Sequence, residues 1–467
     1  MLGLKDLEVK PIGYLPKAMI EGVELGPDVV IALEGLGTFK GVTLEERLGE
    51  LRRKGKDLGK VSYKIHKEST RRGHSSIATS LILQFEVARC SRAASMLLVA
   101  PPFGSYLQES QRRRMVERDE FFAPETLRDN KTYLDTIRKM YDTYRWLVEH
   151  EVELEDARYI LPLASKTSLF ASGSLETFIG LIKPDVSDEY YPEELRVIGE
   201  TLRRLFHEVS PMLTQAREEF ENPLPTYPYT NPYKPHNKLM EKIIDESVEP
   251  GEPRLLDLMV VGVDSRMIEE ALSRGLSEAS GLNSLIQAVF LESLSLAAYH
   301  QSIRHRTIPT AVESIYTAVD RAMREGEKWA VVPPKIKGDE GLAGRFSETF
   351  NDAVEGYQKL IEEGARFSEA LYLLPQSLRI YVVRTYNAFN LLWPQGYVGM
   401  RTCSYAQWEE RANAYGIWRA IESKLPELAS LMGEKCRMLG YCPEKSWCPI
   451  ILKYHRYDEE EHRRRSS

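Results

Sequence analysis

The stretch Leu161-Pro-Leu-Ala-Ser-Lys166 has a counterpart in Leu374-Pro-Gln-Ser-Leu-Arg379, and this pairing decides how the chain is organised. In both stretches a cation stands five residues after the leucine of the Leu-Pro pair. Each stretch also ends a similar series, which consists of an apolar segment, a turn rich in arginine and a long helix-like segment. By themselves these parallels leave two interpretations open, a tandem duplication and a chance likeness of order.

The spacing of apolar residues predicts a mixture of helices and strands. Helical spacing is found in residues 131–151, 192–220 and 341–363. Asn130 is a suitable N-cap for the first of these helices. Alternating, β-branched or aromatic residues predict strands at 80–89 and 380–386. Because the two kinds of element do not alternate strictly, the sequence predicts an α+β fold.

Prolines separate the two series. Residues 221–235 read ENPLPTYPYTNPYKP, and residues 249–254 read EPGEPR. Proline fixes φ and removes a hydrogen-bond donor, so the first stretch is expected to be neither helix nor central strand. We therefore expect an N-terminal repeat over residues 1–220, a linker over 221–254 and a C-terminal repeat over 255–467.

The composition is that of a globular protein with 467 residues, enough for two or three domains. The net charge of −7 provides no overall attraction for nucleic acid, so an anion site has to be a local cluster of cations. No apolar run approaches the roughly 20 residues of a membrane span, and the N-terminus lacks the layout of a signal peptide. We expect a cytoplasmic protein with no membrane or nucleic-acid partner.

Five cysteines, an odd number, argue against a disulfide framework. Cys436, Cys442 and Cys448 lie near the end of the chain, with His455 a little further on. Metal sites usually show more closely spaced cysteine pairs. We therefore expect reduced thiols and no metal.

The most conspicuous local feature is Gln301-Ser-Ile-Arg304-His305-Arg306. Adjacent cationic side chains repel one another, so such a cluster is most stable beside an anion, and arginine matches phosphate or carboxylate groups with two parallel hydrogen bonds. The sequence therefore suggests a pocket for a phosphate or an electron-rich ring. A solvated basic helix end is the alternative interpretation.

A second basic turn reads Ser110-Gln111-Arg112-Arg113-Arg114. A hydroxyl and a guanidinium two residues apart can share one phosphate group. The alternative is an exposed turn neutralised by Glu109 and Glu117. Arg401 lies in GMRTCSYAQWEERA, where Tyr405, Trp408 and Ala412 are predicted to form the buried face of a helix.

The sequence contains no motif for a protein nucleophile, a nucleotide-binding loop or a zinc protease. An enzyme without such groups needs a bound cofactor for the difficult step of its reaction.

Taken together, these features resemble the flavin-dependent thymidylate synthases. The signature of that family is Arg-His-Arg-x-x-Ser, a Ser-x-Arg element soon afterwards, and then Leu-Pro, Asn-Ala, Arg and Ala-Gln-Trp-Glu in that order. The C-terminal half supplies Arg304-His305-Arg306, Leu374-Pro375, Asn387-Ala388, Arg401 and Ala406-Gln407-Trp408-Glu409. Its tail from Cys436 to Cys448 also looks like the Cys-Pro-Glu tail of many members.

Each half departs from the signature where the other keeps it. In the C-terminal half, Pro309 stands at the first serine, and Tyr316 stands where an arginine should follow Ser314. In the N-terminal half, residues 100–102 (Ala-Pro-Pro) occupy the Arg-His-Arg position. That half keeps a Ser-x-Arg loop at residues 108–113 and a Gly-His-Ser-Ser element at residues 73–76.

The family resemblance explains why the signature elements are divided between the two halves. Family members are homotetramers whose sites combine Arg-His-Arg from one subunit with Ser-x-Arg from another. A tandem fusion that keeps one copy of each element retains half of its sites. The resemblance therefore implies two repeats related by a pseudo-two-fold axis, and a homodimer that mimics the tetramer.

The resemblance also implies an activity. FAD, reduced by NADPH, delivers a hydride, and methylenetetrahydrofolate or a related pterin delivers a methylene group to C5 of dUMP, which yields dTMP. The flavin would be bound by Arg304, His305, Arg306 and Asn387, with His74 and Ser76 closing over its ring. The nucleotide phosphate would be bound by Ser110, Gln111 and Arg112. The uracil or sugar would be reached by Gln301, Arg304 and Arg401, with Arg304, Arg401 and Ser110 as the catalytic set. Lys166 or Arg379 is expected to replace a further nucleotide-binding arginine of the family.

Two alternatives remain open at this point. The departures at Pro309 and Tyr316 favour a catalytically silent relative that binds flavin or nucleotide or serves assembly. A related flavin enzyme that modifies another uracil nucleotide or an RNA uridine is the other, although the acidic composition disfavours RNA.

Overall fold

The computed structural model describes residues 1–74, 76–219, 227–244, 251–444 and 448–454. The chain divides into two compact units, and each combines segments from both halves of the sequence. The first unit consists of Met1–Asp142, Leu161–Tyr233 and Glu355–Leu374. The second consists of Thr143–Ile160, Lys234–Val354 and Pro375–Ser467. In the described ranges, no helix combines the length and the apolar character that a membrane span requires.

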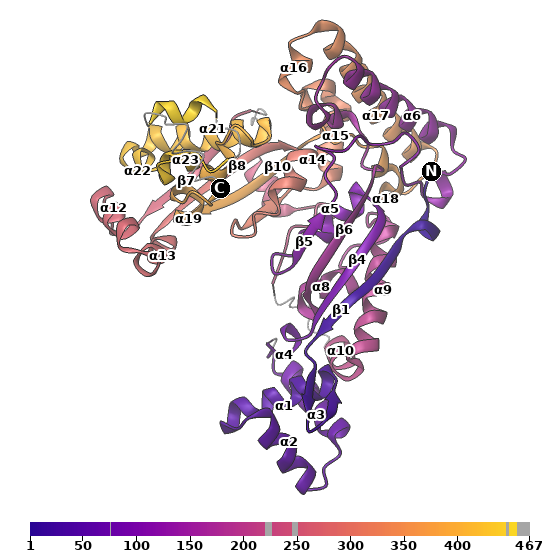
Figure 1. Cartoon of the computed structure of the whole chain (residues 1–467). Helices are drawn as coiled ribbons and strands as arrows, with labels where there is room; N and C mark the ends of the chain where they lie inside the picture. Colours follow the sequence, from indigo (N-terminus) through magenta and orange to yellow (C-terminus); the bar gives the residue numbers. More distant parts are fainter. Residues whose placement is uncertain (75, 220–226, 245–250, 445–447, 455–467) are drawn as a thin grey trace. The chain divides into compact units, whose positions relative to one another are not determined.

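The first unit is built on a four-stranded antiparallel sheet (Figure 1). Its strands, in spatial order, are β1 (Glu8–Leu15), β4 (Ile82–Ser91), β6 (Lys166–Ser174) and β5 (Ser105–Gln108). Strand β4 confirms the strand predicted at 80–89. Its alternate residues Leu83, Phe85 and Val87 are completely buried, because successive side chains of a strand point to opposite faces.

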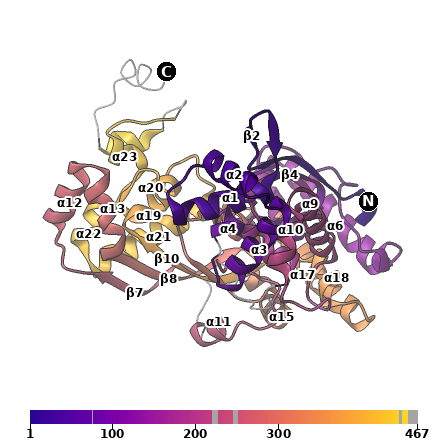
Figure 2. The same cartoon turned by 90° about the horizontal axis from the view of Figure 1, so that it is seen from below.

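One of the predicted helices is divided in two. Residues 192–220 form α9 (Glu193–Val209) and α10 (Pro211–Glu218), and Phe220 lies outside the described residues. Ser210 leaves the helical conformation with φ −151° and ψ 73°, and Pro211 begins a new helix, as proline can only at a first turn. Other helices of this unit are α1 (Pro27–Lys40), α2 (Leu44–Arg53), α3 (Leu58–Arg71) and α4 (Ser76–Thr79), which Figure 2 labels, and α5 (Arg92–Leu98) and α8 (Leu175–Ile182), which Figure 1 labels.

The second unit repeats the architecture of the first. Its antiparallel sheet has the spatial order β7 (Arg254–Val260), β8 (Ile286–Ser295), β10 (Arg379–Asn387) and β9 (Thr310–Val312), which is the same order by position in the repeat. Strand β10 confirms the strand predicted at 380–386. Together with the helices, the two sheets confirm the α+β class.

A backbone hydrogen bond directly after the short edge strand, β5 or β9, occurs at equivalent positions in the two repeats. The Glu109 N–H donates to the Ser168 carbonyl at 3.0 Å in the first unit. The Glu313 N–H donates to the Tyr381 carbonyl at 3.1 Å in the second. Ser314 therefore occupies the place in its repeat that Ser110 occupies in the other.

Helices cover the sheet of the second unit around a core that includes Phe290, Tyr386 and Ile417. The helices that contribute to this core are α12 (Ser265–Arg274), α13 (Leu276–Leu285), α19 (Ala388–Leu392), α20 (Tyr397–Arg401), α21 (Trp408–Lys424) and α22 (Pro426–Leu431). Within the expected linker, residues 227–235 are neither helix nor strand, as their prolines predict, and α11 (Lys238–Ile243) follows.

Two long helices confirm the remaining helix predictions. They are α6 (Lys131–Glu149) and α17 (Glu340–Glu362). The Asn130 side chain accepts a hydrogen bond from the Tyr133 N–H at 2.9 Å and caps α6 as predicted. Short helical segments follow each helix: α7 (Leu154–Ala157) and η3 (Arg158–Ile160) after α6, and α18 (Phe367–Ala370) and η5 (Leu371–Leu373) after α17.

A buried carboxylate holds the first unit together where its segments join. Glu194 of α9 accepts hydrogen bonds from the Ser91 N–H at 2.9 Å and from the Tyr372 hydroxyl at 2.9 Å. Tyr372 belongs to the segment that the second half of the sequence contributes. We refer to these three residues as the Glu194 cluster.

The second unit contains the equivalent arrangement, the Glu409 cluster. Glu409 of α21 accepts hydrogen bonds from the Ser295 N–H at 2.7 Å and from the Tyr159 hydroxyl at 2.6 Å. Tyr159 belongs to the segment that the first half of the sequence contributes. The same serine, glutamate and tyrosine in both units indicate that the chain arose by duplication.

Candidate active site

The Arg304-His305-Arg306 sequence lies in the second unit, in the loop between α14 (Leu296–Ser302) and β9. The loop is tied at both ends, because the His305 N–H donates to the Ser302 carbonyl at 2.9 Å and the Thr385 N–H donates to the Pro309 carbonyl at 3.0 Å. The two arginine side chains are exposed, and the histidine is half-buried. The loop thus presents its cations outward from a fixed backbone.

His305 is held by Arg401, the last residue of α20. The Arg401 Nε–H donates to His305 Nε2 at 2.8 Å. Since a guanidinium can only donate, Nε2 is the acceptor and the ring proton of a neutral His305 resides on Nδ1. Burial, followed by the charges of Arg401, Arg384 and Arg304, lowers the pKa of His305 well below its usual value. His305 is therefore neutral at physiological pH.

Two further guanidinium groups act on Arg304, the first arginine of the loop. Although the Arg304 side chain is partly exposed, surrounding protein desolvates its guanidinium, and this desolvation, followed by the charges of Arg401 and Arg158, lowers its pKa. Arg158 belongs to η3, in the segment that the first half of the sequence contributes to this unit. Like charges that act on one another in this way destabilise the unliganded site, and a bound anion lowers that cost.

Glu410 and Tyr397 support this arrangement from behind. Glu410 Oε2 lies 3.7 Å from Arg401 Nε and accepts a hydrogen bond from the Tyr397 hydroxyl at 2.9 Å. The Tyr397 ring meets the His305 ring edge to face, with centroids 5.3 Å apart. These contacts fix the direction in which Arg401 and His305 point.

Asn387 lies at the start of α19. Its side-chain oxygen caps the helix by accepting from the Asn390 N–H at 3.2 Å and from Asn390 Nδ2 at 2.8 Å. Asn390 in turn accepts from the Thr307 hydroxyl at 3.0 Å, which ties this cap to the Arg-His-Arg loop. Because the oxygen is engaged, Nδ2 is the group that Asn387 can offer as a donor to a ligand. Gln301 is half-buried near the end of α14.

The Ser110-Gln111-Arg112 turn lies in the first unit, directly after β5. The Ser110 hydroxyl accepts from the Arg112 N–H at 3.3 Å, so the turn is closed on itself. Gln111 is only 5% exposed, yet neither polar atom of its amide has a hydrogen-bond partner among the described residues. A buried amide of this kind needs a partner, which a ligand or another protein surface can supply.

His74 and Ser76 also lie in the first unit, between α3 and the start of α4, and their side chains are exposed. The His74 N–H donates to the Ser69 carbonyl at 3.0 Å. The Ser76 carbonyl accepts from the Thr79 hydroxyl at 2.8 Å. Ser75 lies outside the described residues.

In the second unit, the counterpart of the Ser110 turn has become the start of a helix. The Ser314 hydroxyl accepts from the Tyr316 N–H at 3.2 Å and caps α15 (Ile315–Glu325). Tyr316, at the position of Arg112, is only 5% exposed. This turn therefore has no guanidinium where the other repeat carries one.

Comparison with known proteins decides the family. The sequence model described as "Thymidylate synthase complementing protein" matches residues 38–212 and 262–427, one stretch in each repeat and together most of the chain. The chain belongs to the flavin-dependent thymidylate synthase family. The two matched stretches confirm that its fold is duplicated.

Members of this family from two archaea are among the most similar relatives. The flavin-dependent thymidylate synthase of Pyrococcus abyssi is 30% identical over 166 residues, which cover 34% of this chain and 65% of that protein. The enzyme of Thermococcus onnurineus is 28% identical over 181 residues, which cover 38% and 71%. The chain thus spans about two thirds of the length of these relatives. A solved UMP/dUMP methylase from Streptomyces cacaoi covers 46% of this chain and 96% of its own, with 15% identity and a TM-score of 0.37.

One prediction about the Ala-Gln-Trp-Glu segment of this family member is wrong. Tyr405 is 51% exposed because it precedes α21, and Ala412 is exposed on that helix, while Trp408 is half-buried. The buried face of α21 instead begins with Glu409, and Glu410 and Asn413 also belong to it. A search for apolar spacing could not find this face because its first members are polar.

Arg158 was not among the site residues predicted from the sequence. Lys166, proposed as a further nucleotide-binding cation, donates to Glu120 at 2.6 Å, and Arg379 donates to the Ser293 hydroxyl at 3.1 Å. Arg158 is the additional guanidinium that lies beside Arg304. In both Leu-Pro stretches a tyrosine stands two positions before the leucine of the Leu-Pro pair. Arg158 precedes one of these tyrosines.

The cysteine tail forms a small cluster of its own. Cys436 and Cys442 are buried against Ile451 in the second unit. No group of three or more potential ligands able to hold a metal occurs among the described residues, and His455 lies outside them.

Proposed function

We propose that the chain is a flavin-dependent thymidylate synthase that converts dUMP to dTMP with FAD, NADPH and methylenetetrahydrofolate or a related pterin. The observation that carries this proposal is the pair of Arg304 and Arg401 beside a neutral His305, in a member of this family. Such a group is costly to keep without an anionic ligand.

The residues of the second unit suit a flavin. Arg304, Arg306 and the side-chain amide nitrogen of Asn387 can donate hydrogen bonds to an electron-rich ring. Neutral His305 can donate from Nδ1 without adding a further positive charge. Bound FAD supplies the hydride that no side chain of the protein can provide. We assign these four residues to flavin binding.

The Ser110 turn suits a phosphate group. Its hydroxyl, its backbone N–H groups and the Arg112 guanidinium are donors, and the Gln111 amide still needs partners. We assign these three residues to the nucleotide phosphate. The exposed His74 and Ser76 are proposed to cover the flavin ring.

The uracil ring needs stabilisation of the negative charge that develops on its oxygens while C5 reacts. We assign this role to Gln301, Arg304 and Arg401, with Arg158 as an additional cation. Donors that already point at the ligand before the reaction begins lower the barrier without the cost of rearrangement. Glu410 and Tyr397 act as positioning residues for Arg401.

Release of tritium from dUMP labelled at C5 tests the proposal. The full chain, purified with FAD, should release tritium only when both the pterin and NADPH are present. Release that persists without flavin or reductant would refute the redox role, whatever the affinity for dUMP. We further expect a cytoplasmic homodimer, which size-exclusion chromatography with light scattering can check for oligomeric state.

A catalytically silent relative is the second candidate, and Tyr316 favours it. With a buried tyrosine in place of an arginine, the second repeat has lost one nucleotide element of the family. Tight binding of dUMP or FAD with no tritium release under any combination of substrates would support this alternative.

A further inference from the structure

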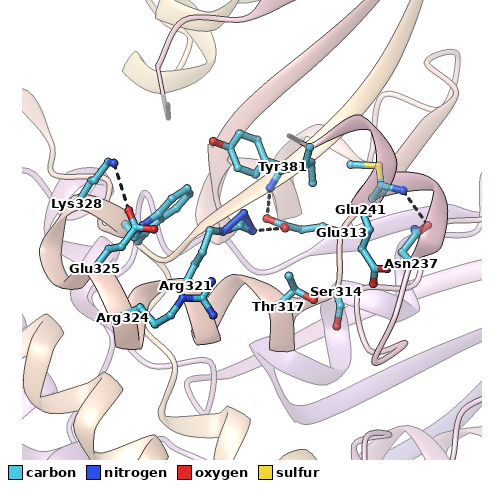
Figure 3. A pocket seen from close by; sticks show the side chains of 13 residues that line it. Asn237, Glu241, Glu313, Ser314, Thr317, Arg321, Arg324, Glu325, Lys328 and Tyr381 are labelled. Atoms are coloured by element: carbon cyan, nitrogen blue, oxygen red, sulfur yellow. Dashed lines mark hydrogen bonds and ion pairs between the residues drawn. The ribbon is translucent and has the colours of Figure 1, made fainter. Parts of the chain in front are cut away.

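A cavity of 580 Å³ lies in the second unit, and none of the residues assigned above to flavin or dUMP lines it (Figure 3). Its walls come from α11, from α15 with the η4 turn (Gly326–Trp329) that follows, and from Tyr381 of β10. This volume is in the range of sites that bind drug-sized or nucleotide-sized molecules.

One face of α15 and the following turn provides most of the polar lining. Ser314, Thr317, Arg321, Arg324 and Lys328 follow one another at intervals of three or four residues and all line the cavity. Residues at these intervals lie along one side of a helix. Two hydroxyls are therefore followed by three cations along the same wall.

Two of the three cations are already neutralised. The Arg321 guanidinium pairs with the buried Glu313 carboxylate and lies over the rings of Trp329 and Tyr381, at 4.5 and 5.0 Å from their centroids. Lys328 Nζ lies 3.2 Å from the Glu325 carboxylate. Arg324, in contrast, is exposed and forms no ion pair within 4 Å with any residue in the described part of the chain, although its charge acts on Asp320 and Glu325. Arg324 is thus the cation that remains for an anionic ligand.

The opposite end of the cavity carries a group that can accept hydrogen bonds. Figure 3 shows Glu241 and Asn237 at the end of the pocket remote from Arg324 and Lys328. The Glu241 carboxylate is exposed, with His236 Nδ1 at 3.5 Å as its nearest charged-group neighbour among the described residues. The Asn237 amide is engaged with the Val312 carbonyl at 2.7 Å and the Met240 N–H. Glu241 is therefore the group that can accept a hydrogen bond from a ligand.

The middle of the cavity can hold a flat ring. Met240, Ile244, Trp329 and Tyr381 give it apolar and aromatic walls. Arg321 is buried, and its Nε–H has no hydrogen-bond partner within the described residues, so a polar atom of a ligand could satisfy it.

We propose that this cavity binds a nucleoside monophosphate whose base carries an amino group. The phosphate pairs with Arg324, the ring lies against the Arg321 guanidinium that covers Tyr381, and the amino group donates to Glu241. A carboxylate only accepts hydrogen bonds, so Glu241 discriminates against a uracil base, which presents an oxygen at the same position. The ligand is thus chemically distinct from dUMP, and the proposal does not depend on the proposed catalytic function.

Calorimetric titration of the full chain with CMP and with UMP tests this proposal. These two ligands differ at the amino group that Glu241 should recognise. We expect CMP to bind about tenfold more tightly than UMP, since loss of a charge-assisted hydrogen bond costs about a factor of ten or more. Arg324→Gln should weaken CMP binding about tenfold, and Glu241→Gln should abolish the preference for CMP.

Two further variants separate this cavity from the proposed dUMP site. Lys242→Gln changes an exposed residue of α11 that does not line the cavity and should leave CMP binding unchanged. Arg112→Gln should weaken dUMP binding without affecting CMP. Equal affinities for CMP and UMP would overturn the proposal, as would CMP binding that responds to Arg112→Gln and not to Arg324→Gln.

Discussion

The two units share a scaffold but differ in the groups that they offer to ligands. Both have the same order of strands, and both hold a buried glutamate between a serine N–H and a tyrosine hydroxyl. Only the second has the Arg-His-Arg loop, and only the first has an arginine two residues after the serine of its turn. We expect each scaffold residue to be needed for its own unit to fold, whereas one copy of a proposed ligand-binding residue can serve the chain. On this account, duplication kept the scaffold in both repeats and each proposed ligand group in one.

The largest effect that we predict concerns the loop that only the second unit possesses. Arg304→Gln should reduce kcat/KM for dUMP by about 100- to 1000-fold, as expected when a preorganised donor to developing charge is removed. Tritium release at varied dUMP concentration measures this. Arg419→Gln, an exposed residue of the same unit that pairs with Glu252, is the matched control and should retain full activity. An Arg304→Gln enzyme as active as this control would remove the loop from the mechanism.

The second prediction compares the two buried carboxylates through their response to pH. Burial raises the pKa of Glu194 to about 7, from 4.5 for an ordinary glutamate. A carboxyl group whose pKa is higher in the folded than in the unfolded state stabilises the folded protein at pH values below 4.5. This stabilisation is lost as the pH rises to about 7. The loss amounts to about 3 kcal/mol at most.

Urea unfolding of the wild type and of Glu194→Gln across this pH range measures the effect. The glutamine cannot ionise, so the variant should show a flatter dependence of its unfolding free energy on pH. Burial raises the pKa of Glu409 too, but Ser295, Tyr159 and the Arg379 charge favour its ionised form, so Glu409→Gln should change the dependence less. Identical pH profiles for the wild type and Glu194→Gln would show that Glu194 does not titrate in this range.

The third prediction tests whether the Glu194 and Glu409 clusters contribute equally to the stability of the protein. Tyr159→Phe and Tyr372→Phe each remove a hydroxyl that donates to a buried carboxylate, at 2.6 and 2.9 Å. Each change should lower the free energy of unfolding by about 2 kcal/mol, the usual value for a hydrogen bond to a charged group.

Thermal unfolding of the two variants checks this prediction. Tyr227→Phe, which alters a tyrosine that is 51% exposed, is the control and should unfold like the wild type. If only one of the two cluster variants were destabilised, the scaffold of the other unit would not depend on its carboxylate as we suggest.

The smallest predicted effect concerns Arg158, one of the residues by which the two Leu-Pro stretches differ. Arg158→Leu gives this stretch the residue that Leu371 provides in the other repeat. It should weaken dUMP binding about tenfold, which corresponds to one lost cation near the ligand. Calorimetry with dUMP measures the change. An unaltered affinity would leave Arg304 and Arg401 as the cations responsible for nucleotide binding.

Local sequence patterns predicted the elements whose pattern is strong. The alternation around Phe85, the long periodic helices α6 and α17, and the Asn130 cap were all predicted from neighbouring residues alone. The break at Ser210 was missed, because apolar spacing continues across it and the proline that begins α10 is compatible with a helix start.

What could not be predicted depends on residues far apart in the sequence. Arg158 and Arg304 come together only because the second unit includes a segment from the first half of the chain. The Glu194 and Glu409 clusters arise in the same way, and their glutamates look like ordinary surface residues in the sequence. Contacts of this kind require the fold, since no local spacing encodes them.

The number of FAD molecules bound per chain tests the central claim most directly. Only the second repeat keeps Arg-His-Arg, while residues 100–102 of the first are Ala-Pro-Pro. Equilibrium binding of FAD to the full chain, followed by quantification of the released flavin, should give one FAD per chain, and Arg304→Gln should reduce this value. Two flavins per chain, or none, would contradict the division of ligand groups between the repeats.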